Sequence, residues 1–256
     1  MAEGYKLAVV SGSRMDQGKS TIVDNLIAPR LENLVRFEIE SLSTGSQKAG
    51  ITKIKGCELQ ILRRSLLILP DTHNFVCDVG GSEFVNFMAE MLRYKSTAGE
   101  FDRILFVMRS TGIKEGDSLA SIAELIEMGA HPDKVSVIFN FELFTVGLAE
   151  MRRNLRARFA KVFAGADEYG FQVCQTPIVN AELLYKAVFN SPDWTVDGLA
   201  NAPNFRIKIK ELVAGGKEVP EALFVLEALQ EQARSFGKAN LDAVWAEIMA
   251  ASQGVK

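Results

Sequence analysis

The stretch Tyr5-Lys-Leu-Ala-Val-Val-Ser-Gly-Ser-Arg-Met-Asp-Gln-Gly-Lys-Ser-Thr21 decides the fold of this chain. Its apolar run from Leu7 to Val10 predicts a short buried strand, and the polar residues after it predict a loop. Lys19 then opens a predicted helix. The apolar positions of that helix are Ile22, Leu26 and Ile27. A strand, a loop and then Gly-Lys-Ser at a helix start is the context in which such a loop binds phosphate.

The first amides of a helix lack intrahelical acceptors and carry a partial positive charge, so they bind phosphate oxygens. Lys19 is placed to reach terminal phosphates, and the Ser20 hydroxyl to join a Mg2+ shell. The usual first glycine of the motif falls at Ser13, so a plain strand-to-helix turn with an exposed lysine stays open as an alternative. The residues predicted to bind nucleotide here are Ser13, Arg14, Met15, Asp16, Gln17, Gly18, Lys19, Ser20 and Thr21.

Composition favours one large α/β domain in the 256 residues, with 48% hydrophobic and 24% charged side chains. We expect a core over about residues 5–180 and a C-terminal helical part over about 181–256. The net charge of -3 gives no general attraction to nucleic acid or to anionic membranes. Three cysteines far apart predict neither a zinc site nor a disulfide framework. With no signal sequence and no apolar run of ~20 residues, we expect a cytoplasmic protein.

Strand-like runs alternate with segments of helical spacing. Further strands are predicted at residues 34–39, 74–79, 101–108, 134–139 and 171–179. Helices are predicted at residues 56–68, 83–93, 117–129 and 148–164. This alternation predicts a doubly wound, mostly parallel sheet flanked by helices. Because ligands bind beyond the carboxyl ends of such strands, the residues after each strand are the candidates for function.

Acidic residues end two of these strands. Glu38 and Glu40 alternate with apolar residues, so their side chains share one side of the strand. Two carboxylates there are suited to orient a water or to hold Mg2+ through water. The alternative is the polar edge of a half-exposed strand.

Asp78 ends the third predicted strand, before Gly80 and Gly81. A buried, unpaired carboxylate costs free energy, and beside a phosphate loop Mg2+ is its natural partner. The two glycines allow backbone to approach a terminal phosphate closely. Ser82 and Glu83 are suited to cap the helix that follows. A tight turn before a capped helix is the alternative.

Asn140 follows the fifth predicted strand, and its amide suits the edge of a purine or the closing of a turn. Residues 175–180, which include Pro177, would form the other wall of that base pocket. The predicted helix 148–164 has a basic face against a single acid, Glu150. That face comprises Arg152, Arg153, Arg156, Arg158 and Lys161. It would follow a nucleic-acid backbone without sequence preference, or be merely solvated.

The C-terminal part has a weak pattern over residues 193–214, which suggests an insertion. Pro220 predicts the first turn of a helix that Gly237 ends, and Asn240 predicts the cap of a last helix. Both helices have one apolar face, and we expect them to pack on the sheet or to form a subunit interface.

Taken together, these residues resemble the ParA/MinD group of deviant-Walker ATPases. The loop of that group reads Lys-Gly-Gly-x-Gly-Lys-Ser/Thr-Thr, and Arg14-Met-Asp-Gln-Gly-Lys-Ser-Thr21 stands in its place. The Asp-x-Asp of the group is matched by Glu38-Ile-Glu40 and its switch aspartate by Asp78. Within the group, the chain looks most like the StbB-type plasmid stability and conjugal-transfer ATPases.

The resemblance implies ATP binding, slow Mg2+-dependent hydrolysis and a homodimer on ATP binding, with DNA or a DNA-binding adaptor protein as partner. It implies a role in plasmid stability or segregation. Catalysis would fall to Lys19, Arg14, Glu38 and Glu40, and metal binding to Ser20 and Asp78.

The loop departs from the group pattern at three positions. Arg14 replaces a signature lysine, which keeps the charge but changes its shape and reach. Met15 and Asp16 replace glycines, and the Asp16 carboxylate would repel a triphosphate unless it points away or meets the metal. Two alternatives therefore stay open. One is a small-molecule enzyme resembling dethiobiotin synthetase, and the other is a nucleotide-dependent binding module without useful hydrolysis.

Overall fold

The structure is a computed structural model that describes residues 4–12, 18–40, 50–109, 115–140, 148–179, 184–185, 187 and 194–250. In this part of the chain, seven strands form one sheet in the order β3-β2-β4-β1-β5-β6-β7. The strands are β1 Lys6–Val10, β2 Leu34–Ile39, β3 Ile51–Ile54, β4 Asn74–Val79, β5 Arg103–Arg109, β6 Val135–Asn140 and β7 Gln172–Val173. Each strand pair is parallel, which confirms the predicted doubly wound sheet.

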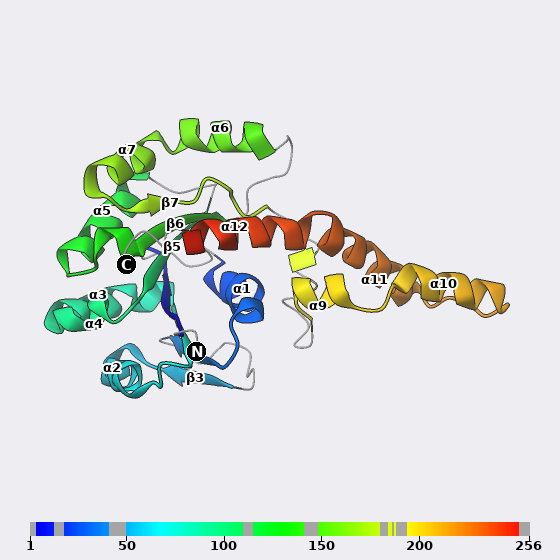
Figure 1. Cartoon of the computed structure of the whole chain (residues 1–256), viewed down its shortest axis with the longest axis horizontal. Coiled ribbons are helices and arrows are strands. Elements are labelled where there is room, and N and C mark those ends of the chain that lie inside the picture. The colour runs from blue at the N-terminus through cyan, green and yellow to red at the C-terminus, as the bar shows by residue number, and fades with distance from the viewer. Residues whose placement is uncertain are drawn as a thin grey trace.

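Helices cover both faces of the sheet, as in a doubly wound α/β fold (Figure 1). One face is covered by α2 Leu59–Ile68, α3 Phe84–Arg93, α4 Lys95–Gly99, α5 Glu115–Glu127, α6 Leu148–Arg158 and α7 Ala160–Tyr169. The other is covered by α1 Lys19–Ile22, its continuation η1 Val23–Ile27 and η2 Ala28–Arg30, α9 Val196–Asn201 and α12 Lys238–Ala250. Short 3-10 turns lie at η3 Gly56–Glu58, η4 Gly81–Glu83 and η5 Pro132–Lys134.

The side chains of the central strand β1 point alternately to the two faces of the sheet, which explains why helices pack on both. In β1, Ala8 and Val10 belong to one apolar core, whereas Leu7 and Val9 belong to the other. Successive side chains of a strand point to opposite faces, so a strand covered on both sides is a continuous apolar run. The helix after Lys19 buries its apolar residues against the second core, as the sequence predicts.

Two strand predictions need correction. The short strand β3 pairs with β2, and sequence reasoning missed it because it has only four residues, two of which, Thr52 and Lys53, are polar. The predicted strand 171–179 is wrong in length, since β7 holds two residues. The Gln175 and Thr176 amides donate to the Glu247 carboxylate of α12 instead of to a neighbouring strand.

The predicted helix 148–164 is wrong in its continuity. It breaks at Phe159, where φ is -109° and ψ is 39°, and a second helix then runs to Tyr169. The break lets two rings meet one partner on β6, because Phe159 and Phe163 both pack against Phe139, with ring centroids 4.6 Å and 6.1 Å apart. The basic residues on this segment are thus divided between two helices.

The C-terminal part forms a helical hairpin, α10 Phe205–Ala214 and α11 Glu221–Gln232, that projects from the body (Figure 1). We call residues 205–232 the arm. Gly237 does not end the second helix as predicted, because the π-helical turn η6 Ala233–Gly237 joins α11 to α12. Asn240 does not cap a helix either: its side chain bonds the Pro177 carbonyl and the Val179 amide. None of the helices in the described ranges has the length and apolar character needed to span a bilayer.

Candidate functional site

Three neighbouring strands bring the predicted acidic residues together. In the sheet register, Asp78 of β4 lies beside Val9 of β1 and beside Glu38 of β2. Glu38 in turn lies beside Lys53 of β3. Because all strands are parallel, these residues lie toward the carboxyl edge, next to the helix that follows β1.

Gly18 sets the direction in which that helix leaves the sheet. Its φ of 75° lies in the left-handed region, which a residue with a Cβ adopts only under strain. The Gly18 carbonyl accepts the first helical hydrogen bond from the Ile22 amide at 3.1 Å. Lys19 and Ser20 therefore begin the helix at the edge of the sheet.

The Lys19 side chain is buried at this edge, with 7% of the residue exposed. Its Nζ donates a hydrogen bond to the Ser11 Oγ at 3.0 Å. A turn with an exposed lysine, the alternative considered above, does not describe this residue. Ser11 was missed by the sequence reasoning, although a polar residue directly after an apolar strand was the signal that could have found it.

Ser20 and Asp78 meet directly. The Ser20 hydroxyl donates to the Asp78 Oδ2 at 2.6 Å, and Asp78 is 6% exposed. Burial raises the pKa of the Asp78 carboxyl from 3.8 to about 6. The Ser20 hydrogen bond and the Lys19 ammonium lower that pKa, whereas Glu38 and Glu40 raise it. The ionised form of Asp78 is thus held at a cost that a bound cation would relieve.

A second layer of charge lies beside Asp78. The Glu38 Oε2 and the Lys53 Nζ form an ion pair at 3.3 Å. Burial raises the pKa of Glu40, and the neighbouring Glu38 adds to this rise. Lys53 was missed because its strand was missed. Three carboxylates and two lysines are therefore gathered at the ends of four strands.

The turn after Asp78 packs against the end of β2. The Gly80 amide donates to the Ile39 carbonyl at 2.8 Å, and a Cβ on Gly80 would lie 2.7 Å from that same oxygen. Only glycine fits this approach, which holds the Glu40 backbone next to the turn. The predicted capping of α3 by Glu83 is not seen, because its Oε2 accepts from the Asn86 side chain.

The residues described here fit a magnesium–nucleotide complex. Ser20 and Asp78 offer hard oxygen atoms, the ligands that Mg2+ prefers, and Lys19 offers a buried ammonium for phosphate. Thr21 lies in α1, and its carbonyl accepts from the Asn25 side chain at 3.1 Å. The other predicted loop residues lie outside the described part of the chain. These are Ser13, Arg14, Met15, Asp16 and Gln17.

The two residues predicted to read a base are near each other. Asn140 ends β6 and is buried, in register with Arg109 of β5. The amide after Pro177 donates to the Phe139 carbonyl at 2.8 Å, so residues 177–178 lie beside the end of β6. A role for Asn140 and Pro177 in base binding stays a prediction.

The predicted DNA-binding arginines differ in their surroundings. Arg152 bonds the Thr176 hydroxyl at 2.6 Å and pairs with Glu247 at 3.4 Å, so it links α6 to α12. The Arg156 guanidinium lies over the Phe163 ring, 5.2 Å from its centroid. Arg153 is exposed on the same helix. DNA binding by the three stays a prediction.

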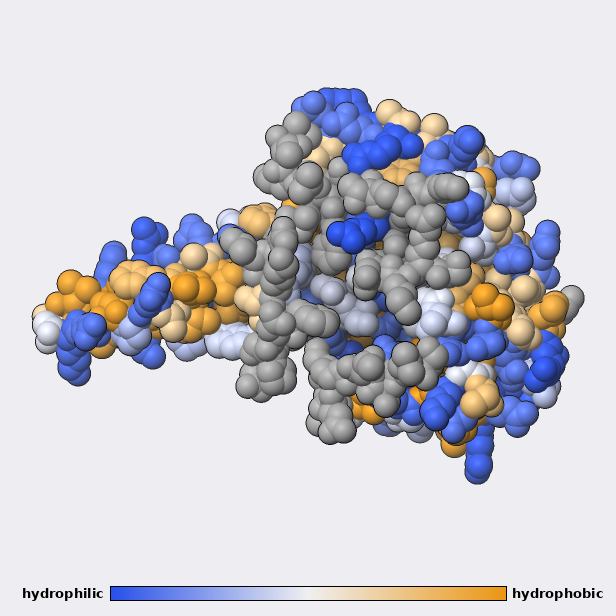
Figure 2. Space-filling model, turned by 180° about the vertical axis from the view of Figure 1, so that it is seen from behind, coloured by the Kyte–Doolittle hydropathy of each residue, from blue (hydrophilic) through white to orange (hydrophobic). Residues whose placement is uncertain are grey.

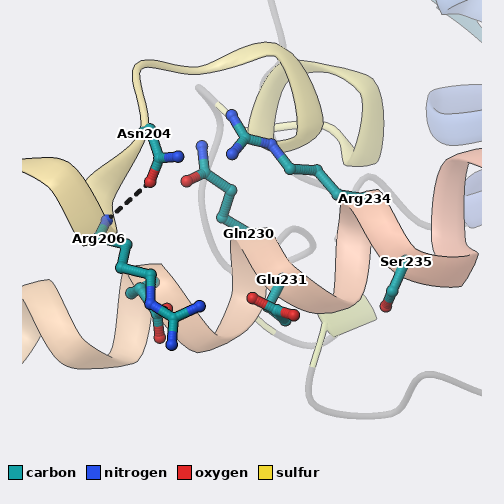
Figure 3. Close-up of a pocket in the computed structure, with 7 residues that line it drawn as sticks. Asn204, Arg206, Gln230, Glu231, Arg234 and Ser235 are labelled. Carbon is teal, nitrogen blue, oxygen red and sulfur yellow. Dashed lines mark hydrogen bonds and ion pairs between the residues drawn. The ribbon is translucent and has the colours of Figure 1, made fainter.

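A separate pocket of about 270 Å3 lies at the base of the arm (Figure 3). Its lining residues are Asn204, Arg206, Glu227, Gln230, Glu231, Arg234 and Ser235. None of them belongs to the cluster around Asp78. The pocket is therefore formed by residues at the base of the arm and is separate from the phosphate-loop site.

No protein family matches the chain, and no curated protein does. Among solved structures, the chain is similar to the MinC:MinD cell division protein complex of Aquifex aeolicus. That match has 12% sequence identity and a TM-score of 0.44, and covers 84% of this chain and 98% of that one. A catalytic mutant of the acetylxylan esterase Axe2 from Geobacillus stearothermophilus has 15% identity and a TM-score of 0.30, and the match covers 92% and 96%. Likenesses this distant assign no activity.

Proposed function

We propose that the chain binds ATP with Mg2+ and hydrolyses it to ADP and phosphate. The observation that supports this most is the cluster in which Lys19 and Ser20, at a helix start after β1, meet Ser11 and Asp78 at the edge of the sheet. A buried lysine, a hydroxyl and a buried carboxylate within hydrogen-bonding distance are the groups that phosphoryl transfer requires.

Each side chain has a role in this proposal. Lys19 stabilises negative charge on the terminal phosphates, and Ser20 and Asp78 hold Mg2+. The metal, when bound, neutralises charge on the phosphate oxygens. Glu40 orients the attacking water and accepts its proton, because a pKa raised by burial makes a carboxylate a better base near neutral pH. Glu38 adds to the rise in the pKa of Glu40 and forms an ion pair with Lys53.

We further propose that the nucleotide-binding parts of two copies associate as a homodimer on ATP binding and separate after hydrolysis, and that Arg14 contacts phosphate in the second copy. The support is the residue resemblance to the ParA/MinD group at Lys19, Glu38, Glu40 and Asp78, with Arg14 in the place of the signature lysine. The same resemblance supports a role in plasmid stability or segregation, in the bacterial cytoplasm at the nucleoid or a plasmid. DNA, or an adaptor protein bound to DNA, would be the partner, with Arg153 on the surface that meets it.

Lys19→Ala should lower ATP turnover by about 100-fold or more, because it removes the cation that stabilises the developing phosphate charge. The measurement is phosphate release with Mg2+, with and without nonspecific duplex DNA. A matched control is Lys134→Ala, which removes a lysine that bonds two backbone carbonyls far from the site. Turnover by Lys19→Ala equal to that of the control would sink the assignment of the phosphate loop.

A further inference from the structure

The arm exposes large apolar side chains on both of its helices. Helix α10 contains no buried residue, and its Ile207 and Val213 are 54% and 62% exposed. On α11, Phe224 and Val225 are 51% and 54% exposed. Figure 2 shows hydrophobic surface along the projecting arm, next to hydrophilic surface. Apolar side chains gathered on a projecting element mark a surface that another molecule covers.

The two helices of the arm have opposite charge. Helix α10 contains Arg206, Lys208 and Lys210 against one acid, Glu211. Helix α11 contains three acids and no lysine or arginine. Those acids are Glu221, Glu227 and Glu231. Within the arm, Arg206 and Glu227 lie 3.8 Å apart, whereas Lys208, Lys210, Glu221 and Glu231 are exposed to solvent.

Helical spacing places charge and apolar groups on the same outward faces. On α10, Ile207 and Lys210 are three residues apart and therefore neighbours on the helix surface. On α11, Phe224 has Glu221 three residues before it, and Ala228 has Glu231 three residues after it. The exposed apolar side chains thus lie beside charges whose prevailing sign is positive on α10 and negative on α11.

The base of the arm is built to hold it in one direction. Gln230 is 2% exposed and its Nε2 lies 3.0 Å from the Ala202 carbonyl, while its Oε1 accepts from the Phe205 amide at 3.1 Å. Arg234 donates to the Ala200 and Ala202 carbonyls. Figure 3 shows Gln230 and Arg234 pointing from α11 and η6 toward the segment that precedes α10. A hairpin fixed in this way presents its outward faces at a defined angle.

We propose that the arms of two copies of this chain pair with each other, α10 of one copy against α11 of the other, to form a four-helix bundle. A two-fold axis brings each basic helix to an acidic one twice, which makes the surface self-complementary. Pairing buries exposed apolar side chains that a single hairpin leaves in water. This contact uses neither Lys19 nor Asp78, so it forms without nucleotide and is separate from an ATP-dependent dimer.

Charge reversal tests the pairing directly. Lys208→Glu/Lys210→Glu makes both helices of the arm acidic, and Glu221→Lys/Glu231→Lys makes both basic. Each variant alone should dissociate into monomers, with a dissociation constant raised by about tenfold or more. An equimolar mixture of the two should form a heterodimer, because every contact then joins opposite charges. The measurement is sedimentation velocity of the full chain without nucleotide, at low salt.

Two controls distinguish pairing of the arms from the effects of net charge and of nucleotide binding. Glu124→Lys/Glu127→Lys makes the same change of charge as Glu221→Lys/Glu231→Lys, on exposed positions of α5, and should leave the dimer intact. Lys19→Ala should also stay dimeric, which distinguishes failure of this proposal from failure of the proposed ATPase. A wild-type chain that sediments as a monomer without nucleotide would overturn the proposal, and the arm would then belong to another partner. A mixture that fails to form the heterodimer would overturn the helix-to-helix arrangement.

Discussion

At the scale of single residues, Asp78 is the group whose chemistry the fold alters most clearly. Its carboxyl is buried at the end of β4, within a hydrogen bond of Ser20 and close to two other carboxylates. Burial outweighs the favourable hydrogen bond and the nearby Lys19 ammonium, because the pKa is raised to about 6. At neutral pH the carboxyl is ionised at a cost in folding free energy, so the position suits a group that binds a cation.

This shift in the pKa of Asp78 predicts that Asp78→Asn raises the free energy of unfolding, by an amount that depends on pH, in the absence of nucleotide and Mg2+. Between about pH 4 and about pH 6 the folded wild type binds more protons than the unfolded chain, so its free energy of unfolding falls as pH rises. The Asn variant has no such loss. Its advantage should grow from near zero below about pH 4 to about 3 kcal/mol above about pH 6.

Urea unfolding of both proteins across this pH range measures that difference. The other titrating groups cancel in the comparison, because the two chains share them. A difference in the free energy of unfolding that does not change with pH would show that Asp78 ionises as freely in the folded protein as in the unfolded one.

At the scale of elements, the sequence pattern predicted those strands whose limits depend on nearby residues alone. The limits of β2 and β4, and the sharing of one side by Glu38 and Glu40, follow from runs of alternating or apolar residues. The prediction of strand length failed where a residue far away in the sequence determines the backbone hydrogen bonds. Glu247 of α12 takes the amides of Gln175 and Thr176, and no pattern near residues 171–179 contains that information.

The same reason explains which site residues were missed. Lys53 lies on a four-residue edge strand whose identity depends on pairing with β2. Ser11 became part of the site through contact with Lys19, eight residues later, across a loop. The glycines at positions 18 and 80, by contrast, were placed in the site by their motifs, and their close approach and positive φ provide the physical reason.

Helix α6 gives a prediction of its own. If its exposed face meets a DNA backbone, Arg153→Ala should reduce the slope of log affinity against log salt by about one, because one phosphate contact is lost. The matched control is Arg64→Ala, which removes an exposed arginine from α2. Retention on duplex DNA over a range of salt measures both. Equal slopes for the two variants would show that Arg153 does not contact the DNA backbone.

Arg152 is a poorer choice for that test. Its guanidinium already pairs with Glu247 and bonds Thr176, so a substitution there would disturb the packing of α6 on α12 as well as any contact with DNA. A loss of DNA retention would then have two explanations.

At the scale of the whole molecule, the two proposed functions involve separate parts of the chain. The sheet gathers a lysine, a hydroxyl and three carboxylates at the ends of β1, β2 and β4, whereas the arm projects beyond the body and shares no residue with that cluster (Figure 1). The continuous helix formed by α11, η6 and α12 joins them, since α12 packs in the same core as the helix after Lys19. Nucleotide binding and pairing of the arms can therefore be tested independently.

The central claim is that Lys19, Ser20 and Asp78 form the site of a magnesium–nucleotide complex. Its most direct test is calorimetric titration of ATP into the wild type and Lys19→Ala, each with Mg2+ and with a chelator. We expect binding by the wild type that requires Mg2+ and is lost in Lys19→Ala. Equal binding of ATP by the two proteins, or binding by the wild type that ignores Mg2+, would contradict the account.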